Sequence, residues 1–277
     1  MKVVTTIDEL WQLRQQLPAP VGFVPTMGYL HEGHLSLVRH ARGENAAVIV
    51  SIFVNPAQFG PREDYKNYPR DIRRDLALLE KGGTDIVFLP ETAEMYPEHF
   101  SSWVEVAGIT ERLEGTLRPG HFRGVTTVVA KLFNIVMPDA AYFGQKDAQQ
   151  AAVIRKMVAD LNMNLKVVTL PTIRESDGLA MSSRNTYLNP EQRRAATILY
   201  RALTLAERLF NQGERSADAI RGEMLNLLRQ EPLASVDYVS IADNDTLEEL
   251  RTVQTPALVS IAVKIGTTRL IDNIVLG

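Results

Sequence analysis

The stretch that decides the fold is VGFVPTMGYLHEGHLSLVRHAR, residues 21–42. It opens with an apolar run that is typical of a buried parallel strand, and residues 35–42 carry apolar side chains at helical spacing. The turn between them contains Gly28 and two histidines, His31 and His34. Because α/β sheets bind ligands beyond the carboxyl ends of their strands, this turn lies where a ligand site is expected.

The two histidines predict a site for a phosphate-bearing ligand. We expect His31 and His34 to share one face of the first helical turn, with Gly33 between them adding no side-chain bulk. Unpaired N–H groups and the positive dipole at a helix start favour phosphate oxygens. Imidazoles can also hydrogen-bond a triphosphate and donate a proton as charge builds on the leaving group. The alternative is that the histidines cap the helix or lie on its solvated face.

Apolar runs alternate with helical patterns through the first two thirds of the chain. Buried strands are predicted at residues 21–24, 46–54, 85–89, 140–143 and 166–170. Helices are predicted at residues 35–42, 69–81, 125–136 and 147–161. This alternation predicts an α/β fold with a Rossmann-like, doubly wound parallel sheet.

The order of elements changes after about residue 177. Two helical stretches, 190–211 and 216–230, precede strand-like runs at residues 236–241, 257–263 and 268–273. Helices followed by consecutive strands predict a smaller α+β domain. We therefore expect two domains, residues 1–176 and 177–277.

Composition limits the classes of protein that remain. The chain has 277 residues and a formal net charge of −3, which argues against a nucleic-acid partner. It has no cysteine, which excludes a thiol nucleophile and a thiolate metal site. No run approaches the roughly eighteen apolar residues of a membrane span, and residues 1–6 lack the apolar core of a signal peptide. We expect a cytoplasmic protein without a membrane partner.

A second motif, residues 53–60, follows the predicted strand at 46–54. Its Asn-Pro pair ends the strand and delivers Gln58 to the carboxyl end. The amide of Gln58 is both donor and acceptor, which suits a substrate that carries hydroxyls beside a carboxylate. A polar loop residue is the alternative.

Two further motifs contain positively charged side chains. In residues 142–150, Gly144 permits close backbone approach, Lys146 supplies a mobile charge for phosphate, and Asp147 can cap a helix or accept from a ribose hydroxyl. In residues 171–185, Ser182, Ser183 and Arg184 in a flexible loop suit the β- and γ-phosphates and departing pyrophosphate. The alternative for each motif is that its polar side chains lie on the solvated surface and bind no ligand.

A basic loop at residues 114–125 provides secondary site candidates. Arg118, His121 and Arg123 make it locally basic in an acidic protein, shortly before a predicted helix, and Arg118 and His121 are the candidates. A solvated loop is the alternative.

The motifs resemble those of a known family. HEGH, residues 31–34, resembles the HxGH signature of the nucleotidylyltransferase superfamily, and PTMGYLHEGH, residues 25–34, is similar to the pantothenate synthetase (pantoate–β-alanine ligase) family. The three later motifs are similar to that family in the same order. The resemblance implies an ATP-dependent ligase that condenses (R)-pantoate with β-alanine through pantoyl-adenylate and releases AMP and pyrophosphate. It also implies Mg²⁺ bound with the nucleotide rather than in a protein metal site, and a homodimer.

The resemblance assigns roles to residues of this chain. Those with catalytic roles are His31, His34, Lys146 and Arg184. ATP binding is assigned to Met27, Gly28, His31, Gly33, His34, Gly144, Lys146, Asp147, Ile173, Met181, Ser182, Ser183 and Arg184. Pantoate binding is assigned to Pro25, Thr26, Met27, Gln58 and Gln150, and Gln58 is also assigned to β-alanine.

Two alternatives stay open from the sequence. A cytidylyltransferase-like or aminoacyl-tRNA-synthetase-like enzyme shares HxGH, although the acidic charge balance, the chain length and the two glutamines count against it. A nonenzymatic nucleotide sensor would bind ATP, but it would not need substrate-orienting glutamines or a pyrophosphate-release loop.

Overall fold

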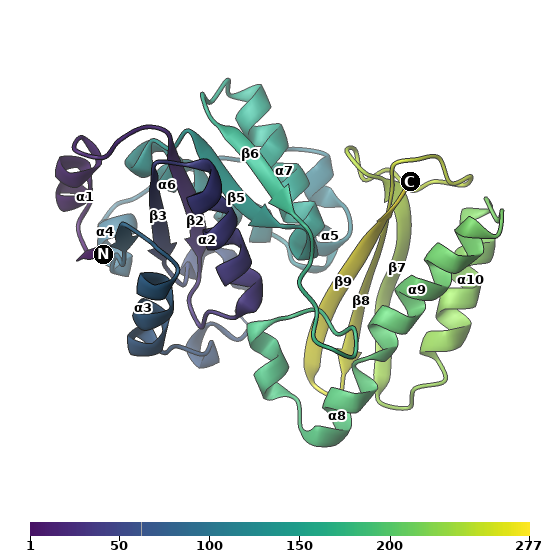
Figure 1. Ribbon diagram of the computed structural model, residues 1–277. Coiled ribbons are helices and arrows are strands. Elements are labelled where there is room, and N and C mark those ends of the chain that lie inside the picture. The colour runs from purple at the N-terminus through teal and green to yellow at the C-terminus, as the bar shows by residue number, and fades with distance from the viewer. Residues whose placement is uncertain (62) are drawn as a thin grey trace. The chain divides into compact units, whose positions relative to one another are not determined.

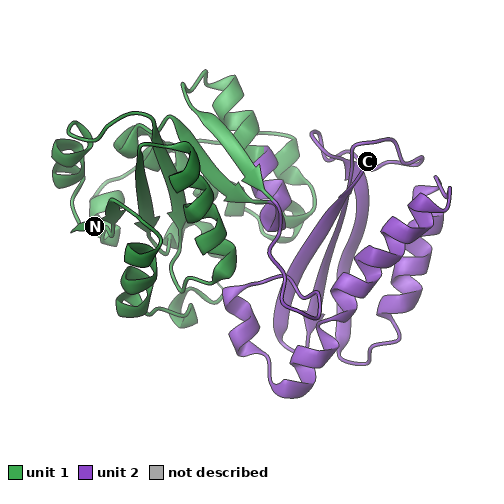
Figure 2. Ribbon diagram, viewed as in Figure 1, with its two compact units in different colours: residues 1–144, 153–170 green, residues 145–152, 171–277 purple. Residues whose placement is uncertain are grey.

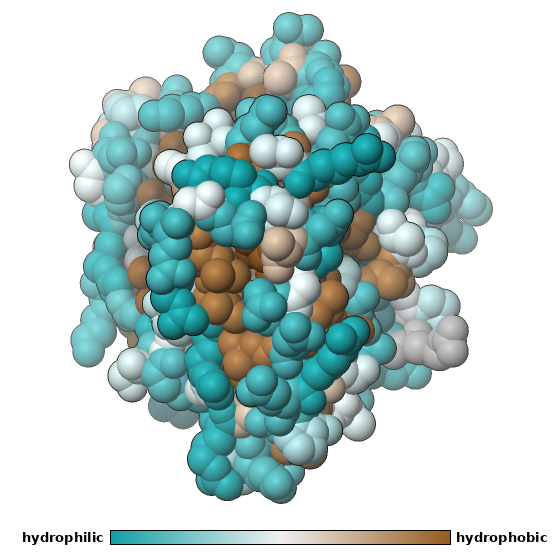
Figure 3. Space-filling model, turned by 90° about the vertical axis from the view of Figure 1, so that its right-hand side faces the viewer, coloured by the Kyte–Doolittle hydropathy of each residue, from teal (hydrophilic) through white to brown (hydrophobic). Residues whose placement is uncertain are grey.

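The computed structural model describes residues 1–61 and 63–277. Two compact units are present, residues 1–144 with 153–170 and residues 145–152 with 171–277 (Figure 2). The domain boundary expected after residue 176 remains a prediction. Within the described residues, no helix is long and apolar enough to cross a membrane. The face seen in Figure 3 is largely hydrophilic, with apolar side chains gathered in one central area.

The first unit is built on a six-stranded parallel sheet in the order β1-β4-β3-β2-β5-β6 (Figure 1). Its strands are β1 (Lys2–Val4), β2 (Val21–Thr26), β3 (Ala47–Ile52), β4 (Ile86–Phe88), β5 (Ala140–Gly144) and β6 (Lys166–Leu170). The predicted α/β fold class is confirmed. β1 was not predicted, because a three-residue strand is too short to show a period. β6 was predicted to be buried but is exposed to half-buried, because it is an edge strand.

Helices surround this sheet and cover its apolar faces. They are α1 (Ile7–Arg14), α2 (Glu32–Glu44), α3 (Ile72–Lys81), α4 (Thr92–Met95), α5 (Glu114–Leu117), α6 (His121–Val136) and α7 (Ala148–Asp160). α2 packs on β2, β3 and β5, whereas α6 packs on β2 and α1. Figure 1 shows α2 in front of the sheet and α6 behind it. The strands can be apolar throughout because both faces are covered.

The strand order reverses between β2 and β5. From β2 the chain steps outward through β3 to β4, whereas β5 and β6 extend the other side of the sheet. The HEGH motif follows β2 directly, and the motif with Lys146 follows β5. Such a switch point is the usual ligand position in an open parallel sheet.

The second unit holds an antiparallel sheet of β7 (Ala234–Asp243), β8 (Ala257–Ile265) and β9 (Thr268–Leu276). α9 (Ile198–Asn211) packs on β8 and β9, and α10 (Ala217–Leu228) packs on β7. Its core includes fully buried Leu199, Met224 and Ile261. The single helix predicted at 190–211 is divided into α8 (Pro190–Ala195) and α9. Hydrogen bonds spanning three residues, Thr197 to Arg194 and Leu199 to Ala196, tighten the chain at that break.

Candidate active site

The turn after β2 is held from behind by a buried carboxylate. Gly28 has φ +81°, and a Cβ there would lie 2.9 Å from the Cγ2 of Ile52, so only glycine fits without strain. The N–H groups of Tyr29 and Leu30 donate to the two carboxylate oxygens of Asp75 at 2.7 and 2.8 Å. Asp75 is fully buried, and burial raises its pKa while the two N–H bonds oppose that shift.

Asp75 was not predicted, although the sequence carried a signal for it. In α3 it occupies the apolar stripe that Ile72, Leu76 and Leu79 define at helical spacing. A charged side chain on the buried face of a helix requires a polar partner, which the turn's N–H groups supply. The turn is therefore set by a helix more than forty residues away.

His31 and His34 form a capping pair at the start of α2. The Nδ1 atom of His31 accepts from the N–H of Gly33 at 3.2 Å, and the Nδ1 atom of His34 accepts from the N–H of His31 at 3.3 Å. The ring centroids lie 4.1 Å apart. Because both Nδ1 atoms accept, the neutral form of each ring has its proton on Nε2.

Two details of the predicted histidine site are wrong. His31 is the N-cap with extended backbone (φ −131°, ψ 176°), so the histidines do not share a helical turn. The N–H groups at the helix start were expected to be unpaired, but those of Gly33 and His34 donate to the Nδ1 and the carbonyl oxygen of His31, respectively. The capping alternative is thus part of the structure, and it orients both rings.

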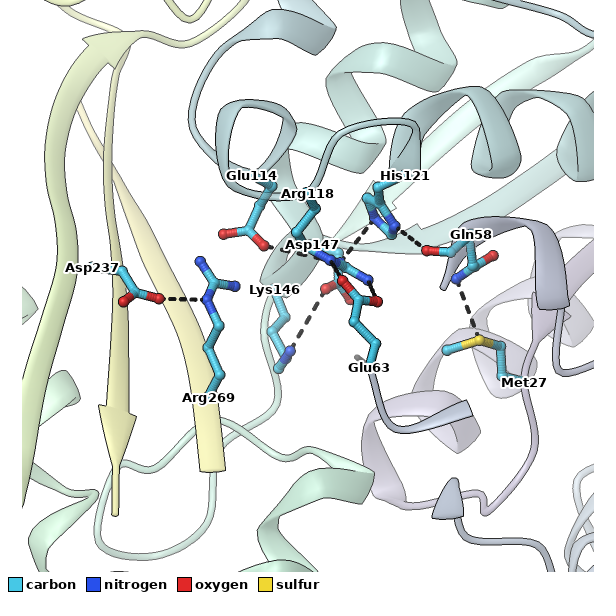
Figure 4. A network of polar contacts seen from close by, with 10 residues as sticks. All are labelled: Met27, Gln58, Glu63, Glu114, Arg118, His121, Lys146, Asp147, Asp237 and Arg269. Carbon is cyan, nitrogen blue, oxygen red and sulfur yellow. Dashed lines mark hydrogen bonds and ion pairs between the residues drawn. The ribbon is translucent and has the colours of Figure 1, made fainter. Parts of the chain in front are cut away.

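Gln58 is oriented by Asn55. Asn55 is 1% exposed, and its Nδ2 donates to the Oε1 of Gln58 at 3.0 Å and to the carbonyl of Gly124 at 3.1 Å. The amide Nε2 of Gln58 therefore forms its donor end, which lies 3.4 Å from the Sδ of Met27 (Figure 4). The role of Asn55 was not predicted, because the sequence marks this residue only as the one before Pro56.

Arg118 and His121 join Gln58 in one polar network in the first unit (Figure 4). Arg118 makes a bidentate pair with Glu63, with both distances 2.7 Å, and its Nη1 lies 3.0 Å from the Nε2 of His121. Because Arg118 only donates, His121 accepts at Nε2 and donates from Nδ1 to the carbonyl of Gln58 at 2.9 Å. Burial, with Arg118 adding to it, lowers the pKa of His121 to about 4. His121 is consequently neutral at physiological pH.

Thr26 and Gly144, two other predicted residues of the first unit, lie at the ends of β2 and β5. Thr26 is 8% exposed, and its hydroxyl donates to the carbonyl of Ser51 and accepts from the N–H of Gly28. A Cβ on Gly144 would meet open space, so close approach by a ligand at this residue remains a prediction. A cavity of about 480 Å³ is lined by Met27, Gly28 and Asp75 among others, but by neither histidine nor Gln58.

The second unit contains the lysine, arginine and serine side chains that were predicted to bind phosphate. Lys146 lies in the short turn η4 (Gln145–Asp147), and its Nζ is 3.6 Å from the Oδ1 of Asp147 (Figure 4). Gln150 is half-buried near the start of α7. Ser182 accepts the N–H of Arg184 at 3.3 Å and begins the turn η5 (Ser183–Tyr187), in which Ser183 is buried.

The segment before Ser182 is a hydrogen-bonded hairpin, whereas the flexibility expected of this loop remains a prediction. The N–H of Met181 donates to the carbonyl of Ile173 at 3.0 Å, and the N–H of Glu175 donates to that of Leu179 at 2.8 Å. Arg193 pairs with Glu175 at 2.6 Å and braces the turn. The sequence concealed this order because Arg193, which stabilises the hairpin, lies outside it.

Comparisons with known proteins identify the family of this chain. Residues 2–275 match the family model described as pantoate-beta-alanine ligase. This chain belongs to the pantoate–β-alanine ligase family. It is 63% identical over 277 residues to a pantothenate synthetase of Herpetosiphon aurantiacus, with all of both chains covered. The predicted family and enzyme class are thereby confirmed.

Solved structures extend the likeness from sequence to fold. The crystal structure of pantothenate synthetase from Thermus thermophilus has a TM-score of 0.95 and 50% identity to this ligase, over 99% of each chain. The enzyme from Francisella tularensis, solved with beta-gamma ATP and β-alanine, has a TM-score of 0.83 and 34% identity over 99% of this chain and 97% of that one.

Proposed function

We propose that this ligase joins (R)-pantoate to β-alanine through pantoyl-adenylate, with AMP and pyrophosphate as the other products. The observation that carries the proposal is the family match over residues 2–275. The relative solved with an ATP analogue and β-alanine supports two of the three substrates. The donor edges of His31, His34 and Gln58 support the assignment of roles.

A carboxylate does not react with an amine unaided, because its oxygen is a poor leaving group. In the proposed reaction the pantoate carboxylate attacks the α-phosphorus in line, and pyrophosphate departs. The β-alanine amine then attacks the mixed anhydride, and AMP leaves. The protein contributes positioning and charge neutralisation without a covalent intermediate.

The side chains divide into phosphate and pantoate contacts. We assign ATP and departing pyrophosphate to these donors: His31, His34, Lys146, Ser182, Ser183 and Arg184. The capped histidines hold their Nε2–H groups in one orientation, so little ordering is needed during the reaction. Met27, Gly28, Gly33, Gly144, Asp147, Ile173 and Met181 complete the proposed ATP site.

Pantoate is assigned to side-chain amide groups rather than to positively charged side chains. Gln58 presents its amide donor because Asn55 occupies its carbonyl oxygen. Gln150 is the second proposed pantoate contact, together with Pro25, Thr26 and Met27. Gln58 is also assigned to β-alanine, which must approach the carbonyl carbon of pantoate.

Magnesium, the oligomeric state and location belong to the same proposal. Within residues 1–61 and 63–277, no group of three or more histidine or acidic side chains could hold a metal ion. We expect Mg²⁺ to be bound mainly through phosphate oxygens and water, where it would neutralise nucleotide charge. We further propose a cytoplasmic homodimer, which rests on the family resemblance, and sedimentation would test the dimer.

Labelled oxygen tests the proposed chemistry. With ¹⁸O in the pantoate carboxylate, we expect one labelled oxygen in AMP, because that oxygen bridges carbon and phosphorus in pantoyl-adenylate. Pyrophosphate should appear with ATP and pantoate alone. Label in free phosphate, with ADP as product, would replace this mechanism by an acyl-phosphate route.

A further inference from the structure

A single buried amide of β9 holds the backbone on both sides of Lys146. Asn273 is 4% exposed, and its Nδ2 donates to the carbonyl oxygens of Gln145 and Lys146, both at 2.9 Å. Its Oδ1 accepts from the Nε2 of Gln145 at 3.1 Å. These carbonyls belong to the peptide groups that precede and follow the Cα of Lys146. Asn273 therefore restrains that Cα from both directions, entirely within the second unit.

Asn273 is itself held by a buried ion pair. The carboxylate of Asp272, whose side chain is 1% exposed, accepts from Arg174 at 2.6 and 3.0 Å. The same carboxylate accepts the N–H of Asn273 at 2.8 Å, and Arg174 donates to the carbonyl of Asn273 at 3.2 Å. Arg174 also lies over the ring of Tyr200, 4.5 Å from its centroid.

The contacts of Asp272 with Arg174 and of Asn273 with the backbone of Lys146 connect segments that are far apart in the sequence. Arg174 begins the hairpin that leads to Ser182, and Lys146 lies in the turn before α7. Residues 272 and 273 are adjacent in β9 and contact both segments. Both proposed phosphate-binding segments are thus attached to one point of one strand.

We propose that Asn273 is a positioning residue for Lys146, and that the Asp272–Arg174 pair keeps Asn273 in place. The inference rests on the proposed function, in which the Lys146 ammonium contacts ATP. A lysine is a point charge on a flexible four-carbon stem, so a mobile Cα would add to the entropy lost on each contact. Fixing the Cα leaves only side-chain torsions to be ordered. A site held in this way is preorganised for the nucleotide.

Asn273→Asp tests the proposal with almost no change in side-chain volume. The substitution places a carboxylate oxygen against two carbonyl oxygens, where the native amide donates. We expect the rate of pyrophosphate release with ATP and pantoate to fall about 10²-fold, the order that misplacement by roughly 1 Å costs. The affinity for ATP should also fall, and that for pantoate should not. Asn226→Asp, which makes the same change on the exposed side of α10, is the matched control and should leave each value unchanged.

A double-mutant cycle separates positioning from a general structural effect. In a Lys146→Ala background, Asn273→Asp should reduce the rate and the ATP affinity by less than about threefold, because the group that it positions is absent. Equal losses in both backgrounds would overturn the proposal. If Asn273→Asp does not fold, Asn273→Ser, which keeps one donor, is measured in the same cycle.

Measuring ATP affinity in the double-mutant cycle tests this inference separately from the proposed function. If the unsubstituted protein binds ATP but releases no pyrophosphate with pantoate, the proposed function fails. Calorimetric ATP titration of the four proteins still measures the coupling between Asn273 and Lys146. Additive losses of affinity in that titration would refute the positioning role.

Discussion

At the scale of single residues, His34 is proposed to donate to phosphate, and it also accepts the backbone N–H of His31. His34→Ala removes a proposed phosphate donor and the acceptor for the N–H of His31. We expect adenylation to slow by about 10²–10³, the usual cost of one transition-state donor. His40→Ala, on the same helix and half-exposed beside Glu44, is the control and should retain the activity. Near-normal turnover of His34→Ala with an unchanged melting curve would remove His34 from the site.

His121 gives the folded protein a defined pH dependence. Its pKa is about 4 in the folded protein because of burial and Arg118, against an ordinary value of 6.5. Between these values the unfolded chain binds more protons, so the contribution to stability is fully present above about pH 6.5 and is lost as pH falls towards about 4. The loss is on the order of 3 kcal/mol. Denaturant titrations from pH 7 to pH 4 should show a smaller decline for His121→Gln than for the unsubstituted protein; parallel curves would contradict this pKa.

At the scale of elements, Gly124 lets α6 approach the short turn η1 (Pro56–Gln58). A Cβ on Gly124 would lie 2.3 Å from the carbonyl oxygen of Ala57, so Gly124→Ala must displace the turn that carries Gln58. We expect a lower melting temperature and at least tenfold weaker pantoate binding by calorimetry. Gly222→Ala, in α10 with open space around its Cβ, should instead stabilise the protein by up to about 1 kcal/mol. A Gly124→Ala protein with native pantoate affinity would show that η1 does not depend on this contact.

At the scale of the whole molecule, the two proposed pantoate ligands, Gln58 and Gln150, are far apart in the chain. We expect Gln58→Ala and Gln150→Ala each to weaken pantoate binding far more than ATP binding, because amides suit hydroxyl and carboxylate groups rather than triphosphate. Separate calorimetric titrations with each ligand decide the matter. Equal losses for the two ligands would mean that the acid pocket lies elsewhere.

Local patterns were sufficient to predict most of the elements. The apolar runs that became β2, β3 and β5 are long and continuous, and the two glycine-containing motifs follow strands as their spacing indicated. The division of α8 from α9 and the edge position of β6 were missed, because each depends on hydrogen bonds or neighbours that a single run of residues does not contain.

The sequence by itself determined the alternation of strands and helices, the family and the kinds of side chain offered to a ligand. Tertiary structure decided how those side chains are held. Asp75 secures the turn before His31, Gly124 accepts from the Asn55 amide that sets the donor end of Gln58, and Asn273 restrains Lys146. The partners in these contacts, Asp75 with Leu30, Asn55 with Gly124 and Asn273 with Lys146, are 45, 69 and 127 positions apart in the chain. A pattern of neighbouring residues specifies local backbone and chemistry, whereas the partner of a buried polar group is chosen only when distant elements pack and exclude water.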